Sequence, residues 1–331
     1  MALADTLLDE IYAAPDDDGV RSIYADYLIE RGDPLGTFIS LQLGRARDRI
    51  ASPSDEEQQL LDTHWRAWIG DSATQLSPLH VAFERGFFSE CDLTDHAVRI
   101  TEASITVRPW SRLRTLMLGA RHAVHLPKLL AVTHRSLRFI GVPGRASFEA
   151  VTQSNLPLRL ETIALAYDLS RDPPPLGTIV GLPSLRTLAF HCLAEFAARW
   201  IERADQANIR HVVLVFEPQT DYVRATLWRA QDTRLVTLAL ELPHEVVCHL
   251  DRSANGALAI QTVELRACST APREQLAIAR HWLNVLDAFV DPDLKVTMPA
   301  VTAELGELAD SLRMRLVRAS TAYAARPRQG A

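Results

Sequence analysis

The chain has 331 residues, 47% of them apolar, as in an ordinary globular protein. No apolar run approaches the roughly 20 residues that a bilayer-spanning helix needs, which argues against a membrane protein. The net charge is −6, but residues 1–60 carry 13 acidic residues against five arginines, which is −8 and leaves +2 on the other 271 residues. An acidic front and a nearly neutral remainder argue against a nucleic-acid-binding surface.

The first ten residues are acidic and lack the basic flank and apolar core of a signal peptide, so we expect a cytoplasmic protein. The four cysteines, Cys91, Cys192, Cys248 and Cys268, form no C-x-x-C pair. In a reducing compartment such residues act as small apolar core side chains. We therefore expect a structural role for all four.

Helical periodicity dominates the first 70 residues. An apolar stripe around Leu7 and Ile11 predicts a first helix, and further helices are expected over residues 20–31 and 35–50. Gly32 suits the end of the second helix because glycine readily adopts a left-handed conformation. Ser54 and Glu57 have the spacing of a capping box, which predicts a fourth helix through Trp68.

These helical segments resemble a known family. Residues 7–11, 15–18, 24–36 (including Tyr24-Ala-Asp26-Tyr27-Leu28) and 38–42 resemble the repeat-companion domain that precedes leucine-rich repeats in many bacterial proteins. The later Phe83-Glu-Arg85-Gly86-Phe87 is similar to the same family. The resemblance implies a helical front domain fused to a repeat array, and it brings no catalytic residues or cofactor with it.

A short hydrophobic spelling recurs after this region. Leu113, Leu116 and Leu118 place apolar residues at offsets 0, 3 and 5, and six further copies follow at steps of 24, 23, 25, 24, 26 and 25 residues. The later copies are Leu137/Ile140/Val142, Leu160/Ile163/Leu165, Leu185/Leu188/Phe190, Ile209/Val212/Leu214, Leu235/Leu238/Leu240 and Ile260/Val263/Leu265. An eighth copy is readable upstream at Phe88/Cys91/Leu93. This period is typical of leucine-rich repeats.

The spelling fits a short strand that buries alternate side chains, followed by a return segment that packs behind it. We therefore expect an α/β fold: an irregular leucine-rich-repeat solenoid with parallel strands on its concave face. The predicted domains are a helical repeat-companion domain at residues 1–78, a solenoid of about eight repeats at 79–299 with an N-terminal cap at 79–93, and a C-terminal capping helix and tail at 300–331.

The segments between the predicted strands differ from one another. Residues 193–207 and 222–230 have helical patterns, whereas Pro173-Pro174-Pro175 favours an extended return. Past Ile260 we expect a helix at 273–289, a last strand through Val296, and an amphipathic helix over 301–323 that covers the final repeat.

The concave face is the expected docking surface for a partner. Its predicted positions carry mainly small and β-branched residues, which strands also favour for purely structural reasons. Aromatic side chains contribute disproportionately to binding. The predicted partner-binding residues of this face are Phe139, His191, His211, Val215, Thr162 and Thr187.

Arginines recur one residue after the anchors, at Arg114, Arg138, Arg186 and Arg210, beside Glu161. At a strand spacing of ~4.8 Å these guanidinium groups repel one another unless acids lie between them. The row is thus either a second partner-binding surface for carboxylates or an edge paired with the protein's own acids.

One string resembles a metal site. In His244-Glu245-Val-Val-Cys248-His249, the offset of four would put two ligands on one face of a helix, as in zinc hydrolases. Cys248 stands where the second histidine belongs, and the segment also suits an ordinary repeat return. We assign no metal, no cofactor and no catalytic residue.

The repeat array and the lack of a coherent catalytic set predict a non-enzymatic scaffold or adaptor that binds another protein or peptide, with no nucleic-acid or membrane partner. A capped array has no need to self-associate, so we expect a monomer. The alternative is a substrate-recognition or regulatory subunit of an enzyme complex, such as a protease or modifying enzyme. A zinc-dependent hydrolase is the third hypothesis.

Overall fold

A computed structural model describes residues 3–14, 17–50, 52–70, 74–105, 107–165, 179, 182–215, 220–242, 246–265, 272–298 and 315–318. The protein is α/β: the described residues form ten α-helices and a 12-stranded, mostly parallel sheet in which the strands follow one another in chain order, β1 to β12. The chain divides into two compact units, residues 1–163 with 181–184, and residues 164–180 with 185–331. Each unit is described by itself below.

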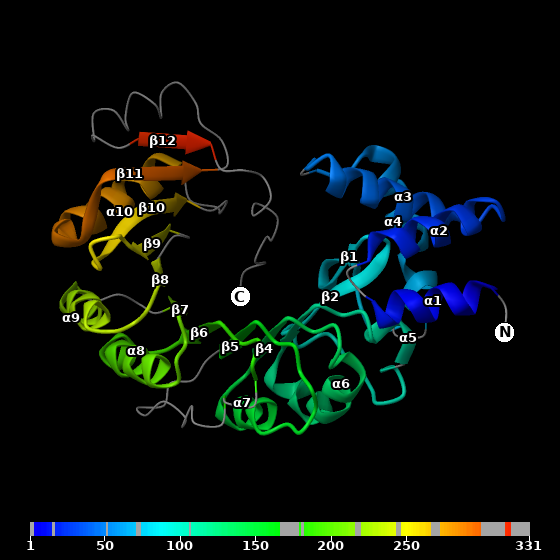
Figure 1. Ribbon diagram of the computed structural model, residues 1–331, viewed down its shortest axis with the longest axis horizontal. Coiled ribbons are helices and arrows are strands. Elements are labelled where there is room, and N and C mark those ends of the chain that lie inside the picture. The colour runs from blue at the N-terminus through cyan, green and yellow to red at the C-terminus, as the bar shows by residue number, and fades with distance from the viewer. Residues whose placement is uncertain are drawn as a thin grey trace. The chain divides into compact units, whose positions relative to one another are not determined.

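The first unit begins with four helices (Figure 1): α1 (Leu3–Ala13), α2 (Asp18–Ile29), α3 (Pro34–Arg47) and α4 (Asp55–Ile69). The sequence predicted all four, with small differences at their ends. Ser54 caps α4 as the capping box implied, because its hydroxyl accepts the N–H of Glu57 at 3.1 Å. Gly32 follows α2 with a φ of +69°, the left-handed conformation expected of it.

A hairpin follows these helices, as expected for residues 79–93. It consists of β1 (Val81–Glu84) and β2 (Phe87–Leu93), which pair antiparallel around Arg85 and Gly86. Strand β2 then pairs parallel with β3 (Thr115–Leu118), Cys91 facing Leu116 and Leu93 facing Leu118. This register confirms that the upstream copy of the apolar spelling lies in line with the next one.

The rest of the first unit alternates strands and helices: α5 (Val107–Trp110), β3, α6 (Leu126–Thr133), β4 (Phe139–Val142), α7 (Arg145–Thr152) and the start of β5 (Thr162–Leu165). Helices α6 and α7 lie on one side of these strands (Figure 1) and bury Leu129, Leu130, Phe148 and Val151. Strands β3 and β5 bury alternate side chains, whereas β4 buries its last three residues. Leu116 and Ile140 are fully buried and adjacent in register.

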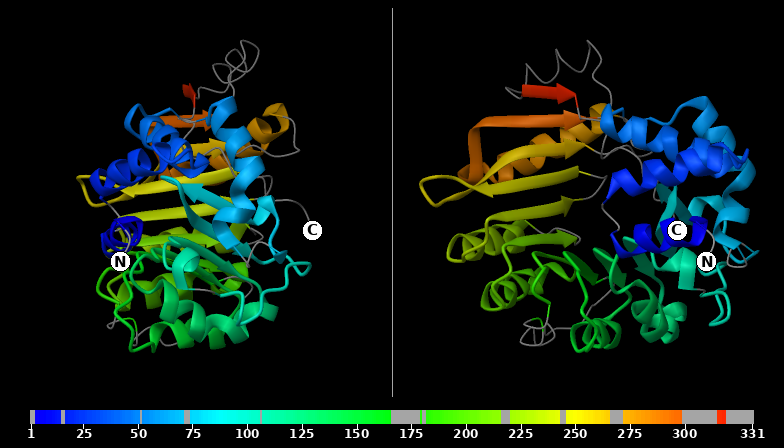
Figure 2. Two further views of the ribbon diagram at one scale, coloured as in Figure 1. Left: turned by 90° about the vertical axis from the view of Figure 1, so that its right-hand side faces the viewer. Right: turned by 45° about the vertical axis from the view of Figure 1, so that its right-hand side comes forward.

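The second unit contains the later strands and helices: β6 (Thr187–His191), α8 (Ala197–Gln206), β7 (His211–Val215), α9 (Thr220–Gln231), β8 (Thr237–Leu242), β9 (Val246–Arg252), β10 (Leu258–Leu265), α10 (Pro272–Val285), β11 (Val290–Met298) and β12 (Arg315–Arg318). Figure 2 shows β7 to β10 side by side. In β6, β7 and β8 the burial alternates strictly, and Leu188, Val212 and Leu238 are adjacent, buried members of one layer.

Two predictions for the second unit are wrong in the described residues. The segment after β8 is not a simple return, because β9 runs antiparallel between β8 and β10. Residues 315–318 lie in β12, which pairs parallel with β11, where a helix over 301–323 was expected. The rest of that predicted helix, and the proline-rich return at 173–175, lie outside the described residues.

No helix in the described part of the chain is both long enough and apolar enough to cross a bilayer. Cys91, Cys192 and Cys248 are buried free thiols, in agreement with their predicted packing role, and Cys268 lies outside the described ranges.

Candidate functional site

The strands β6, β7 and β8 expose one face of the sheet in the second unit. The buried positions alternate with partly exposed ones, which we call the open face. The open face consists of Thr187, Ala189, His191, His211, Val213, Val215, Thr237, Ala239 and Glu241. Its side chains are mostly small or β-branched, so the surface offers few large side chains that would obstruct contact with another protein surface.

Pairing registers bring the predicted residues of this unit together. Thr187 lies opposite His211, and His191 lies opposite Val215, each pair on adjacent parallel strands. His211 also contacts the next strand, where its Nδ1 lies 2.8 Å from the Thr237 hydroxyl. The histidine ring is thus fixed in orientation across β7 and β8. Phe139 and Thr162, the other two predicted residues, are partly exposed on β4 and β5 of the first unit.

Strand β9 places His249 and Asp251 beside the open face, a position that the sequence analysis did not predict for them. His249 lies opposite Ala239 on one side and Thr262 on the other, and its Nε2 is 3.0 Å from a Glu264 carboxylate oxygen. Asp251 lies opposite Thr237, one step further along the strand. Residues 248–251 alternate between apolar and polar side chains, and the two valines before them favour a strand, which was the available signal.

The arginine row is largely paired with the protein's own groups. Arg114 lies 3.6 Å from Glu84, and Arg138 lies 3.4 Å from Glu161. Arg210 donates from Nη1 to the Arg234 carbonyl at 3.0 Å, whereas Arg186 is exposed. Two of the four arginines are therefore paired with acidic residues of the same chain, which was the second of the two expectations for this row.

The zinc-like string does not have the helical geometry that motivated it. Cys248 and His249 are neighbours in β9, so their side chains point to opposite faces, and Cys248 is fully buried. Burial raises the pKa of the Cys248 thiol to about 12, which disfavours the thiolate that binds metals. His244 and Glu245 lie outside the described residues. Among the residues that are described, no group of three potential ligands is close enough to hold a metal ion.

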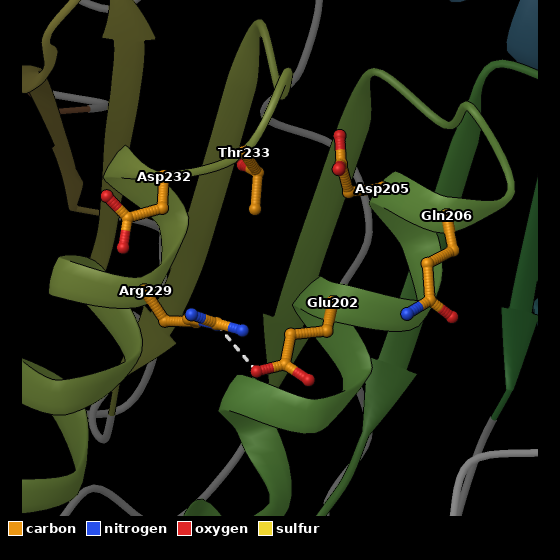
Figure 3. A pocket seen from close by; sticks show the side chains of 6 residues that line it. All are labelled: Glu202, Asp205, Gln206, Arg229, Asp232 and Thr233. Carbon is orange, nitrogen blue, oxygen red and sulfur yellow. Dashed lines mark hydrogen bonds and ion pairs between the residues drawn. The ribbon is translucent and has the colours of Figure 1, made fainter.

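A small polar pocket lies between α8 and α9 (Figure 3). Its volume is about 150 Å³, below the several hundred Å³ usual for a small-molecule site. Its lining residues are Glu202, Asp205, Gln206, Arg229, Asp232 and Thr233. Glu202 pairs with Arg229 at 2.5 Å, and Asp205 accepts the side chain and backbone N–H of Arg234. The first bond joins α8 to α9, and the others join α8 to the segment after α9, so the pocket is better explained by packing than by a ligand.

The matching residues of the family resemblance meet in the first unit. Gln42 accepts the Gly86 N–H at 2.7 Å and donates to Glu57 at 3.0 Å and to the Phe83 carbonyl at 3.3 Å. The Tyr24 and Phe87 rings stack with centroids 6.5 Å apart. The helices and the hairpin therefore share one core. Packing and hydrogen bonding within this core account for the glutamine and the aromatic residues at these positions.

In comparisons with known proteins, no family model, no curated protein and no solved structure matches the chain.

Proposed function

We propose that the chain is a leucine-rich-repeat protein with a repeat-companion domain, and that it binds a protein or peptide partner through the open face. The observation that supports it is the agreement between the sequence period and the strands. Strands β3 to β8 each begin two residues after the anchor of an apolar spelling. In β3 and in β5 to β8 buried residues alternate with partly exposed ones, as in the strands of a repeat array.

In this proposal the open face performs binding rather than catalysis. His211 of the open face is held against Thr237, and beside this face, on β9 and β10, His249 is held against Glu264. A rigid, smooth face loses little conformational entropy on binding. The partner then contributes the aromatic or long apolar side chains, and His191 and His211 of the open face supply polar contacts to it. Each of the possible roles, as a scaffold, an adaptor or a recognition subunit, would use this same surface.

The proposal is tested with two lysine substitutions on opposite sides of the same unit. Val215→Lys puts a charge on the open face, whereas Ala225→Lys puts the same charge on the exposed side of α9. Native pull-down with crosslinking should recover the same partner with the wild type and with Ala225→Lys, and crosslinks should map to β6–β8. Val215→Lys should weaken that interaction at least tenfold in a binding titration.

Equal binding by both variants would place the interaction elsewhere on the chain. To separate the hypotheses of scaffold and recognition subunit, the recovered complex is assayed for protease or modifying activity. Activity that requires the chain for substrate capture favours the recognition subunit, and an inactive complex favours the scaffold.

A further inference from the structure

A serine, a histidine and an aspartate form a chain of two hydrogen bonds beside the hairpin of the first unit. Ser77 precedes the short 3-10 helix Pro78–His80, His80 ends this helix just before β1, and Asp95 follows β2. The Ser77 hydroxyl lies 3.0 Å from His80 Nδ1, and His80 Nε2 lies 3.2 Å from an Asp95 carboxylate oxygen. Asp95 is 15 residues from His80 in the chain, so the fold rather than the local sequence completes the arrangement.

The direction of both hydrogen bonds follows from the state of Asp95. The Ala97 N–H donates to Oδ1 of this carboxylate at 2.8 Å, and this bond, with a smaller contribution from His80, lowers the pKa of Asp95 below its ordinary value. An ionised carboxylate only accepts, so the Nε2 of His80 must carry the proton that it shares with Asp95. In neutral His80 the lone pair is then on Nδ1, where it accepts the Ser77 hydroxyl proton.

A purely structural role for Ser77 would be to cap the short helix that it precedes. Its side chain makes no capping hydrogen bond, and its hydroxyl is directed to the imidazole instead. Ser77 is partly exposed, and the neighbouring Leu79 is 69% exposed, so a reagent can approach the hydroxyl from solvent. A serine with its proton held by an oriented histidine is the arrangement that activates hydroxyl nucleophiles.

We propose that Ser77 is an activated nucleophile, with His80 as its general base and Asp95 as the positioning residue, and that it accepts acyl groups from small carboxylic esters. Ser77 Oγ bonds to the ester carbonyl carbon while the bond from that carbon to the alkoxy group breaks. His80 Nδ1 takes the Ser77 proton and passes it to the leaving alkoxide, which departs as an alcohol. A water molecule then attacks the acyl-serine, the acid is released, and Ser77 regains its proton. This activity is separate from binding at the open face.

The reactivity of Ser77 is measured on the full chain with a fluorophosphonate probe and with p-nitrophenyl acetate. We expect the probe to modify Ser77, as located by peptide mass spectrometry, and Ser77→Ala to lose that modification. His80→Ala should slow the labelling at least tenfold, because general-base assistance contributes about 10²-fold to 10⁴-fold. Ser111→Ala is the matched control, since Ser111 is also partly exposed but donates to the Arg108 carbonyl rather than to a histidine.

Asp95→Asn distinguishes a positioning role from simple structural support. The Asn carbonyl keeps the Ala97 N–H, which leaves the amide N–H₂ facing Nε2 of His80. Nε2 of His80 must then accept a hydrogen bond, so the ring proton moves to Nδ1. A protonated Nδ1 cannot accept the proton of Ser77, and the histidine no longer acts as its base. Labelling should fall at least tenfold, while ¹⁵N NMR of the His80 ring should report the change of tautomer and circular dichroism should stay unchanged.

A wild-type chain that the probe does not modify at Ser77, or a His80→Ala chain modified at the wild-type rate, would overturn the proposal. If Ser77→Ala and His80→Ala only lower the melting temperature and leave ester turnover unchanged, the three residues are a structural tie between the two ends of the hairpin.

Discussion

At the scale of single residues, Gly86 connects the front helices to the sheet. Its φ is +86°, and a Cβ at this position would lie 2.1 Å from Cγ1 of Ile39 on α3. Gly86→Ala therefore combines a left-handed backbone for a non-glycine residue with overpacking of a buried contact. We expect the free energy of unfolding to fall by about 2–5 kcal/mol, measured by urea denaturation.

Gly44→Ala is the control for that substitution. Gly44 lies within α3, and an added Cβ meets no atom within 4 Å. Alanine is the better helix former, so this change should stabilise the protein by about 0.5–1 kcal/mol. A destabilised Gly44→Ala or a tolerated Gly86→Ala would contradict the contact between the hairpin turn and α3.

Tyr24 makes stability sensitive to alkaline pH. Burial is the main cause that raises the pKa of its phenol to about 12, from an ordinary value of 10.0. Because the folded-state pKa is the higher one, the stabilising contribution is complete below pH 10 and is lost as the pH rises toward 12. Tyr24→Phe removes this group, so its stability should fall less steeply over that window in urea titrations at successive pH values. Parallel slopes for wild type and variant would show that Tyr24 ionises freely.

At the scale of elements, Arg252 joins the end of α9 to the β9–β10 hairpin. It donates to the carbonyls of Leu235 at 2.6 Å, Thr233 at 2.9 Å and Ala230 at 3.2 Å, and it also bonds the Gly256 carbonyl. The guanidinium thus adds hydrogen bonds to carbonyls at the end of α9 and just after it; the Ala230 carbonyl also accepts from the backbone N–H and the hydroxyl of Thr233. Arg252→Ala should cost about 2–4 kcal/mol of unfolding free energy.

Arg252→Lys tests whether the stabilisation comes from the several donors of the guanidinium or from its positive charge. Lysine keeps the charge but presents one nitrogen in place of three, so it should recover less than half of the loss. Arg203→Ala, which removes an exposed side chain of α8 that bonds to Gln206 at 3.2 Å, should change stability by less than about 0.5 kcal/mol and serves as control. Full recovery by lysine would attribute the effect to charge at the helix end.

The same region shows where element prediction failed. Strands β3 to β8 were predictable because each repeats one apolar spelling, whereas β9 belongs to no repeat. A 25-residue step from Leu235 to Ile260 is equally compatible with a helical return and with an inserted antiparallel strand. The choice depends on a short alternation at residues 248–251, and the His244–Cys248 spacing suggested a helical face instead. The strand at 315–318 was hidden for a similar reason, since leucines at helical spacing surround it.

The candidate site was only partly predictable for a related reason. The sequence period identified Thr187, His211 and Val215 as members of one face, but the partners of these residues depend on register between strands. Glu264 is 15 residues from His249, and Asp95 is 15 residues from His80. Such pairs have no fixed sequence spacing, so the hairpins had to be known before the pairs were visible.

At the scale of the whole molecule, the proposed repeat array makes a periodic prediction about stability. The residue at offset 3 is at most 1% exposed in every copy from Leu113 to Ile260, whereas its neighbour at offset 2 is partly exposed. The buried set is Leu116, Ile140, Ile163, Leu188, Val212, Leu238 and Val263. Truncation of a buried aliphatic side chain removes its transfer free energy and leaves a cavity. Alanine at each of these positions should therefore cost about 1–5 kcal/mol, with the valines at the low end.

The matched exposed set is Thr115, Phe139, Thr162, Thr187, His211, Thr237 and Thr262, where alanine should cost less than about 1 kcal/mol. Pulse proteolysis in urea measures both series on the full chain. A stacked array requires the large and small effects to alternate in all seven copies, since every layer contributes the same kind of contact to its neighbours. If the alternation holds in some copies and disappears in others, the apolar spelling marks isolated strands, and the face proposed for partner binding is not one continuous product of the repeat.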